Sequence, residues 1–390
     1  MTDEKRTPGA LSGIVVADFG RILAAPYLTM LLADLGAEVI KVERPGAGDD
    51  TRGWGPPFVA GQATYFQSVN RNKTSVTLDL GSDEGQRYAR ELVRRADIVV
   101  ENFRPGTMAK FGLSYTDVRE LNPRAVYCSL SAFGGGKGAE LPGYDLLVQA
   151  AGGLMSITGP GEGEPTKTGV AVVDVLAGLH ATVGVLAALR HRDATGEGQL
   201  VEVNLLSSLL AGMVNQSTAY ALAGVVPTIM GNRHPSIAPY EVFPTADRPL
   251  AVAVGSDGQF GTLCRAIGAD HLADDPRFTD NTARVEHVEV LAAALGEILV
   301  TRPAAEWEAL LTPLGVPCGP VNDMAGAFAL ADRLGLEPRI PSGSADMPPL
   351  VANPITLSRN PVRYTTPPPE LGSGTDRVLA WLDDNCSAQR

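Results

Sequence analysis

Short apolar runs alternate with amphipathic stretches along the first 130 residues. The run at 13–19 predicts a buried strand, the stretch at 26–35 predicts a helix closed by Gly36, and 38–42 predicts a second strand. A strand, a helix and a strand within about 30 residues require a crossover connection, which joins parallel strands. The beginning of the chain therefore predicts a parallel sheet.

The same alternation continues beyond this first unit. It predicts strands at 75–80, 97–100 and 125–131, and a helix at 82–95 with Ser82 as a candidate N-cap. These strands are apolar on both faces, which is expected when helices cover both sides of a sheet. The fold class that follows is α/β, with a Rossmann-like large domain.

The middle of the chain predicts larger helices. We expect a helix at 144–155, a strand at 169–173 that runs directly into a long apolar helix from about 174 to 190, a strand at 199–203 and a buried helix at 205–223. The composition then changes to proline-rich loops, which indicates a domain boundary.

Three regions follow from that boundary. We expect a large domain at 1–224, a smaller α/β domain at 225–325 with a strand at 250–254, and a linker and C-terminal return to the large domain at 326–390 with a helix near 376–382. The sequence shows no internal repeat.

The most membrane-like stretch is 170–189. Asp174 and His180 interrupt it, and both are costly in lipid, so a buried core helix is the better interpretation. The N-terminus is charged and has no apolar run, so no secretory signal is expected.

The cysteines are widely spaced and form no CxxC motif, which favours a reducing cytoplasm and excludes a disulfide framework; they are Cys128, Cys264, Cys318 and Cys386. No metal site is expected, because the histidines show no metal-binding spacing.

Charge narrows the class of ligand. The chain has a formal net charge of −12 at pH 7, which argues against nucleic-acid binding. Nevertheless, several basic residues fall near the predicted carboxyl ends of strands, where α/β sheets bind ligands. Together they would suit a small polyanion such as a nucleotide or coenzyme A, although each alone is also explained as solvated surface charge; they are Arg21, Arg44, Arg71, Lys73, Arg104 and Lys110.

Known nucleotide and hydrolase motifs are missing. The first strand-to-helix turn, 18–26, lacks the GxGxxG pattern that cradles a dinucleotide, which counts against a dehydrogenase. No GxSxG elbow occurs, so an α/β-hydrolase is disfavoured.

Asp174 is the sharpest single candidate, because it is one carboxylate inside an apolar strand-to-helix junction. Asp is a preferred N-cap, so a structural role and a chemical role are both open. At a helix N-terminus the helix dipole and the free amides would keep the carboxylate ionised, and an ionised carboxylate can attack an activated acyl group.

Several motifs together resemble one family. They lie at 11–19, 35–44, 48–54, 70–73, 97–106, 142–145 and 169–178. With this set the chain resembles the class III CoA-transferases, typified by formyl-CoA and carnitine CoA-transferases, with α-methylacyl-CoA racemases as a related branch. The resemblance implies that Asp174 is the nucleophile. It also implies an interlocked homodimer.

The resemblance further implies the ligand contacts. CoA-binding positions are expected at Leu23, Ala24, Arg44, Leu78, Asn102, Phe103, Arg104, Lys110, Tyr144 and Asp145. Leu23 stands where the family often has Gln, so one amide contact is lost. The stretches 152–159 and 234–240 are similar to the branch that transfers CoA from succinyl-CoA to dicarboxylic acids such as glutarate, and Arg233 or His234 would hold the distal carboxylate. Acyl-CoA and a carboxylic acid are then the substrates, and no permanently bound cofactor, nucleic acid or membrane is expected.

Alternatives remain at this point. A racemase of the same family would need a histidine where Tyr144 stands, and a phenol with a pKa of about 10 is a poor base. A loop-stabilising role is an alternative for His234, and a non-catalytic CoA-binding module is an alternative for the whole chain. The sequence favours transfer through an aspartyl anhydride and an aspartyl-CoA thioester.

Overall fold

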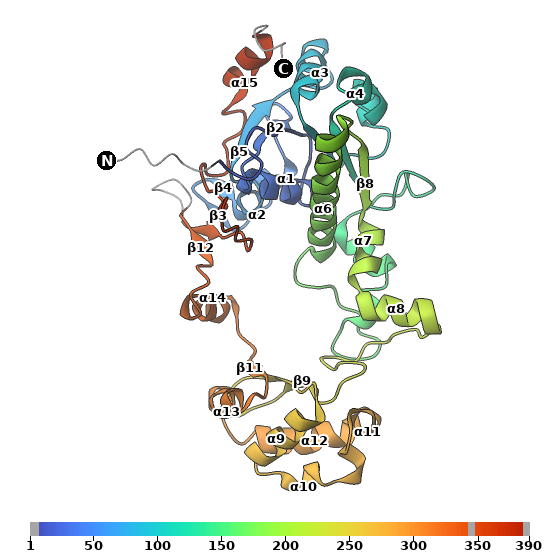
Figure 1. Ribbon diagram of the computed structural model, residues 1–390, viewed down its shortest axis with the longest axis vertical. Coiled ribbons are helices and arrows are strands. Elements are labelled where there is room, and N and C mark those ends of the chain that lie inside the picture. Colours follow the sequence, from blue (N-terminus) through green and yellow to red (C-terminus); the bar gives the residue numbers. More distant parts are fainter. Residues whose placement is uncertain (1–7, 342–347, 385–390) are drawn as a thin grey trace, which may run out of the picture. The chain divides into compact units, whose positions relative to one another are not determined.

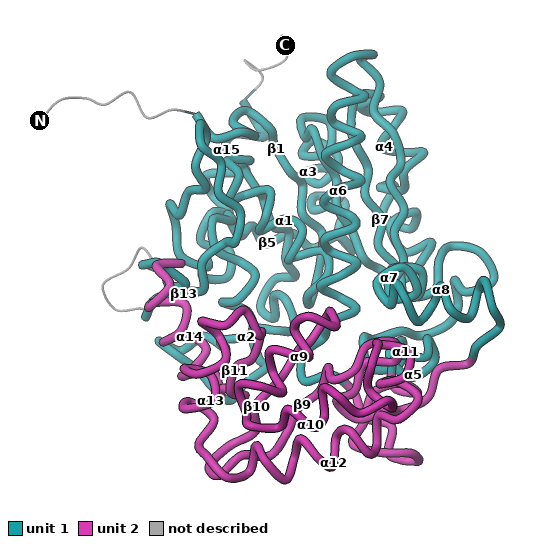
Figure 2. Tube along the Cα trace, turned by 60° about the horizontal axis from the view of Figure 1, so that its bottom comes forward, with its two compact units in different colours: residues 1–154, 168–225, 337–390 teal, residues 155–167, 226–336 magenta. Residues whose placement is uncertain are grey.

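The computed structural model of the chain describes residues 8–341 and 348–384 and divides into two compact units (Figures 1 and 2). The first unit contains the residues up to 154, 168–225 and those after 336, and the second contains 155–167 and 226–336. This division assigns 155–167 and 326–336 to the second unit, whereas the sequence prediction gave them to the large domain and to the returning linker.

A six-stranded parallel sheet forms the centre of the first unit, as the alternating pattern predicted. In space its strands follow the order β5, β2, β1, β6, β7, β8, and every neighbouring pair is parallel. The strands are β1 (Val15–Asp18), β2 (Glu38–Glu43), β5 (Lys73–Thr77), β6 (Ile98–Glu101), β7 (Val126–Ser131) and β8 (Leu200–Asn204). The chain reverses its direction of progress across the sheet between β1 and β6, which makes this position a topological switch point.

Helices bury both faces of this sheet. One face packs against α1 (Ala24–Asp34), α5 (Asp145–Ala151), α6 (Val172–Thr195) and α7 (Leu205–Gly212). The other face packs against α3 (Asp83–Arg95), α4 (Tyr115–Leu121) and α15 (Thr375–Asp383). The C-terminal helix therefore belongs to the core of the first unit.

Three predicted elements differ from the structure. No strand occurs at 169–173, where a loop leads into α6. The helix predicted at 205–223 is broken at Met213 into α7 and α8 (Val214–Ala223), and the helix predicted at 144–155 is the shorter α5. Apolar runs as short as 169–173 do not distinguish a strand from a buried helix start, which explains the first error.

Helix α6 is the one helix among the described residues that is long and apolar enough to span a membrane by length and composition. Its small residues Ala177, Ala181 and Val185 are fully buried against the sheet and α1. It is thus a core helix of the first unit, as the sequence predicted.

The smaller elements of the first unit lie outside this sheet. They are the hairpin of β3 (Phe58–Val59) and β4 (Gln62–Ala63), the helix α2 (Thr64–Ser68), the hairpin of β12 (Arg339–Ile340) and β13 (Leu350–Val351), and the 3₁₀ helices η1 (Asp50–Gly53) and η2 (Met108–Phe111).

The second unit has its own sheet and core. The antiparallel strands β9 (Tyr240–Phe243), β10 (Leu250–Ala253) and β11 (Cys318–Pro320) pair in the order β11, β10, β9. Its helices are α9 (Asp257–Ala266), α10 (Asp270–Ala273), α11 (Asn281–Glu286), α12 (Val288–Leu299), α13 (Ala304–Leu311) and α14 (Met324–Arg333). Leu250, Leu295 and Trp307 lie at the centre of the core of this unit.

Candidate active site

Two cavities adjoin at the switch point of the parallel sheet, and Arg21 and Phe103 line both of them. The first cavity has a volume of about 420 Å³ and the second about 410 Å³. In open α/β sheets, ligands bind beyond the carboxyl ends of the strands at such a point. The position agrees with the strand-end prediction.

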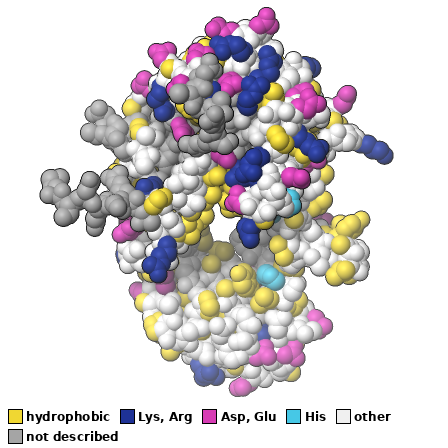
Figure 3. Space-filling view, turned by 45° about the horizontal axis from the view of Figure 1, so that its top comes forward, with side chains coloured by type: hydrophobic (Ala, Val, Ile, Leu, Met, Phe, Trp, Pro, Cys, Tyr) yellow, Lys and Arg dark blue, Asp and Glu magenta, His cyan; other side chains and the backbone are white. Residues whose placement is uncertain are grey.

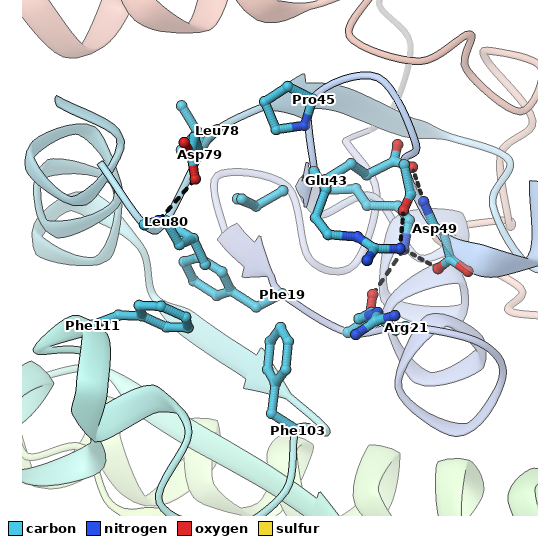
Figure 4. Close-up of a pocket in the computed structure, with 16 residues that line it drawn as sticks. Phe19, Arg21, Glu43, Pro45, Asp49, Leu78, Asp79, Leu80, Phe103 and Phe111 are labelled. Atoms are coloured by element: carbon cyan, nitrogen blue, oxygen red, sulfur yellow. Dashed lines mark hydrogen bonds and ion pairs between the residues drawn. The ribbon is translucent and has the colours of Figure 1, made fainter. Parts of the chain in front are cut away.

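The first cavity has an aromatic side and a charged side (Figure 4). Phe19, Phe103 and Phe111 form the aromatic side, and Arg21 and Asp49 lie opposite. Leu78 and Arg44, both predicted to bind CoA, also line this cavity. An apolar wall facing cations is suited to a ligand that carries both a flat ring and phosphates.

One carboxylate joins two arginines at the cavity walls. The two oxygens of Asp50 pair with Arg21 and with Arg44, the latter at an Nη2–Oδ1 distance of 2.7 Å. Arg44 is 57% exposed, so its outer donors remain accessible to a ligand. Two guanidinium groups facing one carboxylate leave a net positive charge, which favours an anionic ligand.

Two other cations do not belong to this surface. Arg71 is buried against Asp34, with a 2.6 Å ion pair, and Lys73 is buried against Asp18 at 3.2 Å. Burial lowers the pKa of Lys73 to about 8, and the neighbouring Asp18 only partly offsets this effect. The interpretation of Arg71 and Lys73 as ligand-binding cations is therefore wrong, because each neutralises a buried carboxylate.

Asp174 lies in the wall of the second cavity. Helix α6 begins at Val172, so Asp174 is its third residue and not its N-cap. The predicted capping role is instead performed by Asp145 from α5, whose Oδ2 accepts from the backbone N–H of Val173 at 2.8 Å and of Asp174 at 3.1 Å. Since another carboxylate caps the helix, the side chain of Asp174 is available for chemistry.

The surroundings of Asp174 raise its pKa to about 7. Burial is the main cause, and the adjacent negative charge of Asp145 adds to it. Within 8–341 and 348–384, no donor forms a hydrogen bond to the Asp174 carboxylate. The expectation that the helix dipole keeps this group ionised is thus wrong, because Asp145 takes the free amides and contributes a like charge.

Asp145 is positioned by its own partners. It is buried, its Oδ1 accepts from the side-chain amide of Gln149, and Gln149 Oε1 accepts from the N–H of Thr168 at 2.9 Å. Asp145 lines neither cavity. The structure gives Asp145 the role of anchoring the start of α6, and its CoA contact stays a prediction.

The other predicted CoA-binding residues divide between the two cavities. Those that line the second cavity are Leu23, Ala24, Asn102, Phe103, Arg104 and Tyr144. Lys110, on η2, is exposed and lines neither. Tyr144 is 63% exposed, immediately before α5. Most of the predicted set is therefore brought together, with Asp145 and Lys110 as the exceptions.

The sequence analysis missed two groups near this site. Lys41 is fully buried and its Nζ donates to Asp49 at 2.9 Å and to the carbonyl of Gly20 at 2.8 Å. Tyr65 packs beside Leu23, and burial, followed by the charge of Asp174, raises its pKa to about 12. A lysine inside the apolar strand 38–42 was a detectable signal, whereas nothing in the sequence marks Tyr65.

Arg233 and His234 lie in the second unit. Arg233 is paired with Glu241 at 3.1 Å and also with Glu289, and it lines a separate cavity of about 690 Å³. His234 packs on the ring of Tyr240, and its Nδ1 accepts from the N–H of Ser236 at 3.1 Å. These contacts support the loop-stabilising alternative for His234, and a substrate role for either residue stays a prediction.

Among the described residues, no three His, Cys, Asp or Glu side chains form a group that could hold a metal ion.

Comparison with known proteins gives matches over nearly the whole chain. The model of CoA-transferase family III matches residues 11–375. The succinate–glutarate CoA-transferase of Agrobacterium fabrum is 43% identical over 398 residues, which covers 98% of each chain. The human succinyl-CoA:glutarate CoA-transferase is 38% identical, covering 95% of this chain and 85% of its own.

A solved structure agrees with these sequence matches. The CAIB/BAIF family protein from Brucella suis superposes with a TM-score of 0.87 at 39% identity and covers 96% of this chain and 100% of its own. The family resemblance inferred from the motifs is therefore confirmed. The chain belongs to CoA-transferase family III.

Proposed function

We propose that this CoA-transferase moves CoA from succinyl-CoA to a dicarboxylic acid such as glutarate, with Asp174 as the nucleophile. The observation that carries the proposal is the position of Asp174 in the wall of the second cavity. Arg21 lines this cavity and also the adjoining first cavity, whose charged side could hold phosphates. The names of the Agrobacterium and human relatives support the substrate pair.

The proposed reaction proceeds through two kinds of covalent intermediate. The Asp174 carboxylate attacks the thioester carbonyl, and the CoA thiolate leaves to give a mixed anhydride. The thiolate attacks the Asp174 carbonyl, releases succinate and forms an aspartyl-CoA thioester. The acceptor carboxylate then attacks that thioester and expels the thiolate, which finally attacks the acceptor carbonyl and regenerates Asp174.

The raised pKa of Asp174 suits this role. A carboxylate without hydrogen-bond donors is a stronger base and a better nucleophile than a solvated one, and at a pKa of about 7 a substantial fraction is ionised at neutral pH. Asp145 contributes by holding the backbone of α6 in place.

The start of α1 supports stabilisation of the oxyanions formed in each step. Ala24 lines the second cavity, and α1 has no side-chain N-cap and no acidic residue in its first turn. Uncapped amides at a helix N-terminus attract negative charge. We propose that the first amides of α1 face the carbonyl oxygen of the Asp174 adducts.

The pair of arginines on Asp50 supports CoA binding. Arg44 and Arg21 would contact the phosphates of CoA, and Phe103 and Phe111 would pack against its adenine ring. CoA enters here as a substrate, so this assignment includes no permanently bound cofactor.

The epimerase alternative is disfavoured by the surroundings of Asp174. Proton exchange at a 2-methylacyl-CoA needs a second base, and the described residues of the second cavity include no histidine. Asp145, whose charge acts on Asp174, is committed to the amides of α6, and Asp50 in the second cavity is paired with Arg21 and Arg44. A binding module without catalysis would not need a nucleophile with a raised pKa.

We also propose that two copies form the interlocked homodimer expected from the family, and that the enzyme acts in the cytoplasm. The strand order supports the Rossmann-like assignment of the first unit.

Helix α8 has no buried residue, and Val214, Tyr220 and Leu222 on it are 65%, 62% and 84% exposed. Hydrophobic side chains gather where α8 protrudes (Figure 3). Such a patch is typical of a protein interface, and sedimentation of the purified chain tests the dimer.

Trapping with hydroxylamine tests the chemistry. Incubation with succinyl-CoA and then hydroxylamine should convert activated Asp174 to a hydroxamate, which peptide mass spectrometry locates. Glutarate, oxalate and other acids are then offered as acceptors, because a relative from Acetobacter aceti that is 40% identical is named an acetyl-CoA:oxalate CoA-transferase.

The Asp193→Asn variant is the control for this experiment, because Asp193 lies at the far end of α6 and lines neither cavity. It should form the hydroxamate at Asp174 at the wild-type level, whereas Asp174→Asn should form none. Absence of the adduct in wild type with succinyl-CoA and a panel of other acyl-CoAs would refute the covalent proposal.

A further inference from the structure

Ile22 has a left-handed backbone conformation, with φ +68°, in the turn between β1 and α1. For a β-branched residue this is a genuine outlier, because its side chain crowds the following carbonyl. Ile22 lines the second cavity together with Asp174. Strain of this kind persists only where the surroundings impose it, and it is concentrated at ligand clamps and active sites.

Side chains from neighbouring strands hold the peptides on the N-terminal side of Ile22. The carbonyl of Gly20 accepts from Lys41 Nζ at 2.8 Å. The N–H of Arg21 donates to Asn102 Oδ1 at 2.8 Å, and Asn102 Nδ2 donates back to the Arg21 carbonyl at 2.8 Å. The turn is therefore fixed to β2 and to the end of β6 before the chain reaches Ile22.

Asp49 holds the strained residue itself. The N–H of Ile22 lies 3.2 and 3.4 Å from the two carboxylate oxygens of Asp49. The same carboxylate accepts from Lys41 Nζ at 2.9 Å, from Thr51 N–H at 3.0 Å and from Thr51 Oγ1 at 2.7 Å. Asp49 is buried and saturated with donors, so it is a rigid anchor.

We propose that Asp49 is a positioning residue, which holds Ile22 in the left-handed conformation so that the following residues, Leu23 and Ala24, face Asp174 across the second cavity. A change in the sign of φ at Ile22 would redirect the chain between Arg21, which lines both cavities, and Ala24. The turn thus links the region that binds the acyl-CoA to the reacting carboxylate, an inference that rests on the proposed function of Asp174.

A cycle of substitutions at Asp49 and Ile22 tests this coupling, because glycine adopts a positive φ without strain. Asp49→Asn should lower kcat/KM for the acyl-CoA by about 10-fold in the wild-type background, since the left-handed conformation of a β-branched residue is disfavoured by roughly 5- to 30-fold once it is unsupported. In the Ile22→Gly background the same substitution should cost less than about 5-fold. Equal losses in the two backgrounds would overturn the proposal, because they would show that Asp49 acts independently of Ile22.

A second variant guards against loss of folding. Asp49→Asn leaves Lys41 buried without its partner, and broken buried pairs are strongly destabilising. Asp49→Glu keeps the charge but displaces the carboxylate by one methylene group, so it preserves the ion pair and disturbs the Ile22 contact. Rescue of Asp49→Glu by Ile22→Gly supports the proposal, and absence of rescue in a folded protein contradicts it.

Ala60 supplies the matched control. It has φ +48° at an exposed position of the β3–β4 hairpin and lines neither cavity. Ala60→Gly therefore relieves strain elsewhere, and it should not rescue either Asp49 variant. The wild type is assayed in parallel: if it transfers no CoA the proposed function fails, whereas an active wild type with no rescue refutes only the role of Asp49.

Discussion

Asp49 and Asp174 are two aspartates of the first unit with opposite environments. Burial alone would raise the pKa of Asp49, but the charge of Lys41 and the hydrogen bonds from Thr51 and Lys41 outweigh it and lower the pKa to about 2. Asp174 is half-buried, has no such donors among the described residues and lies beside Asp145, and its pKa rises to about 7. The same side chain is therefore a permanent anion in one place and a titrating group near neutrality in the other.

This difference shows that donors, and not burial by itself, determine the role of a buried carboxylate. A carboxylate whose oxygens already accept several hydrogen bonds has little remaining capacity to react, and it fixes the backbone around it. A carboxylate without donors costs stability when ionised and retains its nucleophilicity. The turn at Ile22 connects the two cases, because Ile22 lines the second cavity with Asp174 and its N–H donates to Asp49.

The largest expected effect is on turnover. Asp174→Asn should lower kcat by at least about 10³-fold, because an amide cannot form the anhydride. The measurement is steady-state transfer of CoA from succinyl-CoA to glutarate. Asp193→Asn, the control on the same helix, should remain active, and retention of a tenth of the wild-type kcat by Asp174→Asn would show that another group is the nucleophile.

The second effect is on stability and its dependence on pH. The pKa of Asp174 is raised in the folded state, so ionisation favours unfolding, and stability falls as pH rises from about 4 to about 7. Asp174→Asn should remove this loss and be more stable than wild type at pH 8 by about 2 kcal/mol. This is roughly half of the free energy that the full pKa shift implies, because the side chain is partly exposed.

Urea unfolding at pH 4 and pH 8 measures this difference. The advantage of Asp174→Asn should shrink to about 0.5 kcal/mol or less at pH 4, because the folded carboxyl is protonated there and the unfolded one, with a pKa of about 3.9, is only about half ionised. Asp49 has the opposite pH dependence. Its contribution to the free energy of unfolding is present above about pH 4 and is lost as pH falls toward its folded pKa of about 2. An advantage of Asp174→Asn that is the same at both pH values would contradict the raised pKa.

The third effect is on binding of the acyl-CoA. Arg44→Ala should raise KM for succinyl-CoA by about 10-fold with a smaller change in kcat, because it removes a charge-assisted contact that is mostly exposed. Arg359→Ala is the matched control, since Arg359 is exposed and lines neither cavity. Equal KM values for the two variants would remove Arg44 from the binding site.

The smallest effect concerns the pH profile. Replacing Asp145 by Asn removes the like charge next to Asp174, which should move the rising limb of kcat against pH downward, by less than about one pH unit because burial remains the main cause. A profile that stays in place would show that Asp145 affects Asp174 only through the helix backbone.

Local patterns were sufficient to predict much of the first unit. The strand predicted at 97–100 was recognisable because its residues 98–100 are apolar on both faces, and the motif residues Arg44 and Phe103 were placed correctly because they follow strands whose carboxyl ends share one edge. Asp174 was found for a related reason, since a charge within an apolar stretch is conspicuous.

The remaining errors come from partners distant in sequence. Arg71 looks like a surface cation until Asp34, 37 positions away, is brought beside it. The capping of α6 depends on Asp145, 28 positions before Val173, so the pKa of Asp174 could not be inferred from its own neighbours. The left-handed conformation of Ile22 likewise has no local signal, because isoleucine does not favour it.

The rate of CoA release in a single turnover, measured from pH 5 to pH 9, tests the account most directly. Enzyme in excess over succinyl-CoA is mixed with a thiol reagent, and the first release reports acylation of the nucleophile. If Asp174 is the nucleophile, this rate should rise with pH to a plateau with a midpoint near 7, and the release should be absent in Asp174→Asn. A rate that is already constant from pH 5, or a release that persists in Asp174→Asn, would contradict it.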